Sequence, residues 1–276
     1  MARKSTKRPG LDLEGQPDPK TPLDWQQFLA DAAPVLTLLK DDLRARAKSS
    51  ASVAEALHAR HDAEKEQKRT ADNFLEWQDH FVEQVAAAWL LSCVFVRTLE
   101  DRGSLGHARL AGPGASDSLK LFLEVAPSLN ERDYLLTVFG ELTRFAATRD
   151  LFDARHNPVW LLTPSAEGAK ALVQLFQRPR ADLPAFRFGQ IDTGFLGWLY
   201  QDLDAGVRER FALLQTPRFV ESFILDRTLE PAIERFGLDD TTIIDPTCGS
   251  GHFLLGAFER LTEHRLRKEP GAGARE

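Results

Sequence analysis

A glycine-rich turn between an apolar run and an apolar helical pattern holds the residue types best suited to chemistry. Thr241 to Ile244 form a β-branched run, which favours a strand. Pro246 cannot continue a strand, so the strand is expected to end at Asp245. Gly249 and Gly251 permit a positive φ and let a ligand approach the backbone. A strand that ends in an acid and leads into a glycine turn and a helix is typical of the first unit of a nucleotide-binding α/β fold.

Four interpretations of this turn can be compared. A phosphate-binding loop requires Gly-Lys-Ser/Thr, but His252 follows the last glycine. A dinucleotide fingerprint requires a third glycine, where the chain has Leu254. S-adenosylmethionine carries a carboxylate that suits the free amides of a helix N-terminus, and Asp245 could face its ammonium or sulfonium group. In the fourth interpretation the glycines serve only the sterics of an ordinary strand-to-helix turn.

The surrounding residues favour the third interpretation. Residues 245–254 read DPTCGSGHFL, which resembles the first motif of the N6-adenine DNA methyltransferases, Asp-Pro-x-Cys-Gly-Ser-Gly-x-Phe-Leu, at every specified position. Residues 214–220 resemble the Tyr-Thr-Pro motif that precedes it and lines the cofactor pocket, with Gln215 replacing the tyrosine. The resemblance implies S-adenosyl-L-methionine as cofactor, bound by Asp245, Pro246, Gly249, Gly251, Thr216 and Pro217. Thr216 and Pro217 also suit a helix start, as N-cap and first helical residue.

Three further segments resemble the N-terminal region of the large PglX-type methyltransferases of phage growth limitation and BREX type 2 defence systems. They are residues 95–103, 151–160 and 195–203. The methyltransferase of the DISARM defence systems is the alternative relative. The resemblance implies methylation of adenine in double-stranded DNA, with other phage-defence proteins as partners. In that family the catalytic Asn-Pro-Pro-Phe/Tyr motif lies downstream of the first motif, so this chain is expected to be truncated and inactive alone.

Asn157-Pro158-Val159-Trp160 resembles that catalytic motif. In the motif, the asparagine oxygen and a proline carbonyl accept hydrogen bonds from the adenine amino group, and the aromatic ring stacks on the flipped base. Circularly permuted methyltransferases place the motif before the first motif. Val159 removes the rigid Pro-Pro turn, however, so we expect Asn157, Pro158 and Trp160 to form a structural turn and assign no catalytic residue.

Composition is ordinary for a globular protein, with 43% apolar residues and a net charge of −6. That charge does not favour bulk attraction to DNA, although DNA affinity depends on local patches. Two cysteines, Cys93 and Cys248, imply no disulfide framework and suit the cytoplasm. Neither a signal peptide nor a metal-binding motif is evident. The apolar run over 85–96 is too short for a membrane span, so no membrane partner is expected.

The expected fold class is mainly α: a helical N-terminal domain, then the first strand-turn-helix unit of a Rossmann-like methyltransferase domain. The predicted parts are a disordered basic tail over 1–22, a helical domain over 23–180, a helical segment over 181–237 and the start of the catalytic domain over 238–276. Apolar residues at three- and four-residue spacing predict the clearest helix over 73–100. Pro34 predicts a break in the helix over 23–48. The rival function is a non-catalytic helical interaction module, or a subunit of a split methyltransferase.

Overall fold

The computed structural model describes residues 25–111, 114–177, 186–189, 191, 199, 216–249 and 251–271. The chain forms two compact units, Met1–Ile191 and Asp192–Glu276. The tail predicted over 1–22, the boundary predicted at 180, and residues 181–185 and 200–215 of the predicted helical segment lie outside the described residues.

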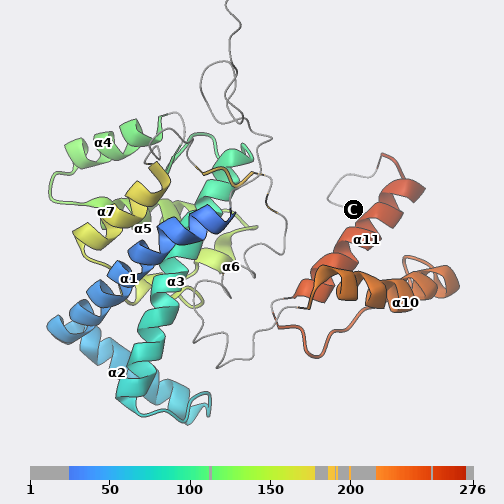
Figure 1. Ribbon diagram of the computed structural model, residues 1–276, viewed down its shortest axis with the longest axis horizontal. Coiled ribbons are helices and arrows are strands. Elements are labelled where there is room, and N and C mark those ends of the chain that lie inside the picture. The colour runs from blue at the N-terminus through green and yellow to red at the C-terminus, as the bar shows by residue number, and fades with distance from the viewer. Residues whose placement is uncertain are drawn as a thin grey trace, which may run out of the picture. The chain divides into compact units, whose positions relative to one another are not determined.

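The first unit is built from helices around α1 and α3 (Figure 1). Helix α3 begins after Asn73, whose side chain accepts hydrogen bonds from the amides of Leu75 and Glu76. Its aromatic and aliphatic face is buried and includes Trp89, which is fully buried. The elements of this unit are α1 (Trp25–Ser49), α2 (Ala51–Glu66), α3 (Phe74–Asp101), α4 (Ala115–Val125), α5 (Glu131–Leu142), α6 (Arg149–Phe152), the 3₁₀ helix η1 (Pro158–Trp160) and α7 (Ala166–Gln177).

Helix α3 is long and apolar enough to cross a membrane when judged by length and composition alone. In the structure, 67% of its most apolar window is buried inside the protein. That burial is typical of the core helix of a folded domain, because the apolar face is covered by the chain's own helices.

Helix α1 continues through Pro34, so the predicted break is wrong. Proline lacks an amide and removes one hydrogen bond from a helix, but helices tolerate this loss where packing holds both sides of the residue. Phe28 and Ala32 before it, and Leu36 and Leu39 after it, are buried. Contacts of α1 with α3 and α7 therefore keep the helix continuous across the proline.

A buried ionic centre lies at the C-terminal end of α3. The guanidinium of Arg97 bonds to the carboxylates of Glu100 and Asp101, and all three side chains are at most 5% exposed. Glu100 also accepts a hydrogen bond from the amide of Leu110, and Asp101 accepts one from the amide of Phe188, at 2.7 Å. The charged residues of segment 95–103 therefore fasten two distant loop segments to α3.

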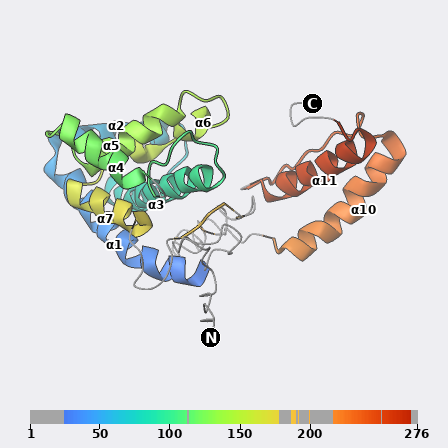
Figure 2. The ribbon, with the colours of Figure 1, turned by 90° about the horizontal axis from the view of Figure 1, so that it is seen from above.

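The second unit contains helices α10 (Arg218–Phe236) and α11 (His252–Lys268), which lie side by side (Figures 1 and 2). Their shared apolar cluster contains Leu225, Leu229 and Ala257, with Ile233, Phe253 and Leu261 packed against it. The helices run parallel, because His252 pairs with Glu221 near both N-terminal ends and Arg265 pairs with Asp239 near both C-terminal ends.

The mainly α fold class is confirmed, but the expected strand over 241–245 is not formed. The described residues contain no strand, and residues 241–245 have no regular secondary structure. Ile244 is 86% exposed. A β-branched run becomes a strand only when a neighbouring strand takes up its backbone hydrogen bonds, and the described part of this unit offers none. The glycine turn and the helix after it are formed; the complete strand-turn-helix unit is not.

Candidate functional site

The glycine turn (residues 245–251, with Ser250 outside the described residues) has the backbone form that its glycines favour. Gly249 has φ of +53° and Gly251 has φ of +80°, both in the left-handed region. Gly251 is the N-cap of α11 and makes no side-chain capping bond. The first amides of α11 are therefore not satisfied by a capping side chain, and such amides suit an anionic group.

Space beside the glycines fits the approach of a ligand to the backbone. A Cβ on Gly249 would lie 3.8 Å from the Thr247 carbonyl oxygen as its nearest neighbour, and a Cβ on Gly251 would lie 3.9 Å from Cys248 Sγ. Gly249 and Cys248 are exposed. Protein atoms therefore leave the face of the turn open, and these residues fit the carboxylate end of S-adenosyl-L-methionine.

Asp245 holds the start of the turn. Its Oδ1 accepts a hydrogen bond from the Thr247 amide at 3.0 Å and from the Thr247 hydroxyl at 3.3 Å. This arrangement fixes the chain direction after Pro246, as aspartate does in Asx turns. Asp245 is partly buried and Pro246 is exposed. One carboxylate oxygen thus has a structural role, in addition to the role toward a cation that the sequence predicts.

The structure brings the two motifs predicted to bind the cofactor to the same end of the second unit. Pro217 directly precedes α10, and Gly251 directly precedes α11. Because the helices are parallel, both N-terminal ends lie together (Figure 2). Pro217 is the N-cap of α10 rather than its first residue, one position later than the sequence predicts for the cap. Thr216 lies just before it and is partly buried.

Three residues beside this end were not predicted from the sequence to belong to the site: Glu221, His252 and Gly256. Glu221 is 5% exposed, and its Oε2 lies 2.8 Å from Nε2 of His252. A Cβ on Gly256 would lie 1.8 Å from Oε1 of Glu221. A signal was present in the sequence, since Glu221, Leu225 and Leu229 recur every four residues and place an acid on the apolar face of a helix.

A second Glu–His pair joins α10 and α11 farther from the turn. Nε2 of His264 lies 2.7 Å from Oε2 of Glu230, and Arg260 bonds to the same glutamate. Burial acts to raise the pKa of Glu230, but the hydrogen bonds from His264 and Arg260 outweigh it and lower the pKa below its ordinary value. Glu230 is therefore held as a carboxylate in the seam between the helices.

Asn157 lies in the first unit with its side-chain amide engaged in the fold. Its Oδ1 accepts a hydrogen bond from the Val159 amide, and its Nδ2 donates to Ser92 Oγ and to the Leu151 carbonyl. The residue is 8% exposed and caps η1, which begins at Pro158. These bonds favour the interpretation of Asn157 and Pro158 as parts of a structural turn.

Trp160 ends the same turn and is partly buried. Its indole nitrogen donates a hydrogen bond to the Phe152 carbonyl. A Cβ on Gly140 would lie 3.8 Å from the Trp160 ring, so the indole packs along α5. The ring is thus held by its own domain rather than presented as a free stacking platform.

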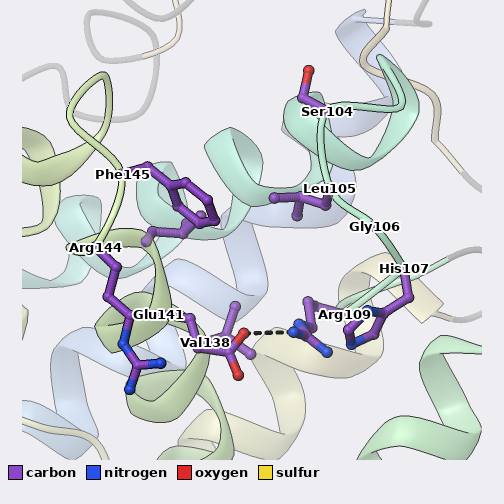
Figure 3. A pocket seen from close by; sticks show the side chains of 10 residues that line it. Ser104, Leu105, Gly106, His107, Arg109, Val138, Glu141, Arg144 and Phe145 are labelled. Atoms are coloured by element: carbon purple, nitrogen blue, oxygen red, sulfur yellow. Dashed lines mark hydrogen bonds and ion pairs between the residues drawn. The ribbon is translucent and has the colours of Figure 1, made fainter.

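A cavity of about 470 Å³ also lies in the first unit, beside the loop that follows α3 (Figure 3). Arg109 lines the cavity and pairs with Glu141 at 2.6 Å. Arg144 and Phe145, whose ring is 57% exposed, line it as well. None of the residues predicted from the sequence to form a site lines this cavity.

Comparison with known proteins gives one curated relative. The chain is 38% identical over 266 residues to the adenine-specific methyltransferase PglX of Streptomyces coelicolor. The match covers 90% of this chain and 22% of the relative, so the chain spans about one fifth of the length of that protein. No protein-family model and no solved structure matches the chain. The chain is a relative of the PglX-type methyltransferases, and the resemblance to that type is confirmed.

Proposed function

We propose that this relative of the PglX-type adenine-specific methyltransferases supplies the cofactor-binding turn of a DNA methyltransferase. The reaction is transfer of a methyl group from S-adenosyl-L-methionine to N6 of adenine in double-stranded DNA. By the same relationship, we place the protein in a cytoplasmic phage-defence system, together with other defence proteins. The observation that carries the proposal is that Thr216-Pro217 and the glycine turn directly precede the N-terminal ends of two parallel helices, which lie at the same end of the second unit.

Each residue of the site has a defined task in this proposal. The amides at the start of α11 donate hydrogen bonds to the carboxylate of the cofactor, and Gly249 and Gly251 keep that approach open. Asp245 faces the positive charge of the cofactor while it holds the turn through Thr247. Pro246, Thr216 and Pro217 line the same pocket. The bound cofactor supplies an electrophilic methyl group.

Among the residues that the structure describes, we assign none the role of polarising the adenine amino group. The segment most similar to the catalytic motif is at Asn157 and Pro158, and there the side-chain amide of Asn157 forms hydrogen bonds within a structural turn. We therefore propose that the isolated chain does not methylate DNA, and that further parts of the enzyme or a partner subunit complete the site. The second unit exposes the apolar side chains of Phe219 (77%) and Phe258 (67%), which supports the proposal that another part of the enzyme or a partner packs against it.

Two measurements test the proposal. Calorimetric titration of the protein with S-adenosylhomocysteine, the demethylated cofactor, should show saturable binding that Gly251→Val removes. Incubation of the isolated chain with radiolabelled cofactor and duplex DNA should give no label in adenine. Absence of binding would contradict the cofactor assignment. Label in adenine that is lost in Asn157→Ala would show that the first unit carries the catalytic motif.

A further inference from the structure

Glu221 occupies a position where a carboxylate is costly. It lies on the apolar face of α10 in line with Leu225 and Leu229, and it is 5% exposed. Burial of an ionised carboxylate is strongly unfavourable unless the charge is paired. Its partner is His252, with Nε2 of the imidazole 2.8 Å from Oε2 of the carboxylate. A buried contact between an acid and an imidazole adds little net stability, so its presence here favours a role in fixing geometry.

Glu221 and His252 lie at the N-terminal ends of the two helices that follow the predicted cofactor-binding motifs. Glu221 lies in the first turn of α10, which begins directly after Pro217. His252 is the first residue of α11 and directly follows Gly251. The contact therefore joins the start of one helix to the start of the other. His252 follows two glycines with positive φ, Gly249 and Gly251. Because glycine has no side chain, the backbone of the turn is weakly restrained, and the contact with Glu221 fixes the position of the residue after it.

Gly256 makes room for this contact. It lies one turn along α11 from His252, and a Cβ there would be 1.8 Å from Glu221 Oε1 and 3.0 Å from its Cδ. The first of these distances is far inside van der Waals contact, so any side chain at position 256 must displace the carboxylate. A glycine inside a helix lowers stability by about 0.5–1 kcal/mol relative to alanine. The close approach of Glu221 explains why position 256 nevertheless holds a glycine.

We infer that Glu221, His252 and Gly256 form a positioning device for the cofactor turn. The pair holds the first turn of α11 against α10, so that the amides after Gly251 keep one direction toward the cofactor carboxylate. None of the three residues needs to touch the cofactor. The inference rests on the proposed function, because it explains how the same turn is held ready for S-adenosyl-L-methionine.

The chain contains a matched control for this device. Glu230 and His264 form a pair of the same residue types, on the same two helices, at 2.7 Å. That pair lies farther along both helices, away from the glycine turn. A merely structural role predicts equal consequences for the two pairs, whereas a positioning role predicts that only the first affects the cofactor.

The experiment measures two quantities on the purified protein: the dissociation constant of S-adenosylhomocysteine by calorimetry, and the melting temperature. Glu221→Gln and His252→Gln should each weaken binding by about fivefold or more, and the double variant should be no weaker than the worse single variant. Glu230→Gln and His264→Gln should lower the melting temperature by a similar amount and leave the dissociation constant unchanged.

Gly256→Ala gives an independent test by adding one methyl group. It should weaken binding as Glu221→Gln does, because the new Cβ displaces the carboxylate. With Glu221→Ala already present, the methyl group meets no carboxylate, so Gly256→Ala should add no further loss. Unchanged binding in all Glu221, His252 and Gly256 variants would overturn the inference, as would equal losses in the Glu230 and His264 variants. Absence of binding by the unaltered protein would overturn the proposed function itself, and the inference with it.

Discussion

Nη2 of Arg97 lies 2.6 Å from Oδ1 of Asp101, and the two side chains are only 2% and 5% exposed. This pair stands at the end of α3 in a segment that the sequence linked to PglX-type proteins. Asp101 also accepts a hydrogen bond from the amide of Phe188, which ties that segment to the end of α3. The charged residues of the segment thus hold the first unit together rather than forming a reactive site.

Arg97→Met is expected to lower the free energy of unfolding by about 3–5 kcal/mol, because it leaves the buried Glu100 without its cationic partner and Asp101 with Arg187 alone. Denaturant unfolding monitored by circular dichroism measures the change. Arg155→Met is the control, since Arg155 pairs with Asp153 on the surface, with 73% of its side chain exposed. A loss in Arg97→Met no larger than in that control would show that the buried network is not needed.

Asn157→Ala is expected to destabilise the first unit by about 1–3 kcal/mol, because Ser92 and the Leu151 carbonyl lose a buried partner. The dissociation constant for S-adenosylhomocysteine should not change. Thermal melting and calorimetry on the same sample separate the two effects. Loss of cofactor binding without a lower melting temperature would instead place Asn157 in the cofactor site.

Gly249→Val and Gly251→Val are expected to abolish binding of S-adenosylhomocysteine. A β-branched side chain resists a positive φ and blocks access to the backbone. Gly237→Val is the matched control, because Gly237 also has a positive φ, +89°, and lies at the opposite end of α10. It should lower stability but keep the affinity. If all three variants bind equally well, the turn is not the cofactor site.

Cys248 is expected to report occupancy of the turn. Its thiol is exposed, whereas Cys93 is buried. Burial raises the pKa of the Cys93 thiol well above its ordinary value, so this residue should stay unmodified in the folded protein. Mass spectrometry after iodoacetamide treatment should show one modified cysteine, at a rate that S-adenosylhomocysteine reduces. An unchanged rate at saturating ligand would place the ligand elsewhere.

Tyr134 is expected to make stability fall in strong alkali. Burial raises the pKa of its phenol to about 12, and the hydroxyl donates a hydrogen bond to the Arg109 carbonyl. The unfolded chain loses this proton near pH 10, at the ordinary pKa, while the folded chain keeps it. The contribution of this group is therefore complete below about pH 10 and is lost as the pH rises toward 12. Ultraviolet titration of a Tyr200→Phe variant, which leaves one tyrosine, checks the value.

Local sequence determined most of the helices. Helix α3 follows from apolar spacing and from the Asn73 cap, and both act within a few residues of the helix itself. The form of the glycine turn was equally local, because Gly249 and Gly251 adopt the positive φ that their lack of a side chain allows. Residue types alone also identified the PglX-type relationship, through the segments 95–103, 151–160 and 195–203.

Tertiary structure decided what depends on partners far away in the chain. Residues 241–245 have strand propensity, but a strand exists only with a neighbour to accept its backbone hydrogen bonds. Pro34 remains inside α1 because buried contacts on both sides outweigh one missing hydrogen bond. The sequence places Glu221 on one helix face with Leu225 and Leu229, but only the parallel packing of α10 and α11 buries it, supplies His252 as its partner and sets Gly256 against its carboxylate.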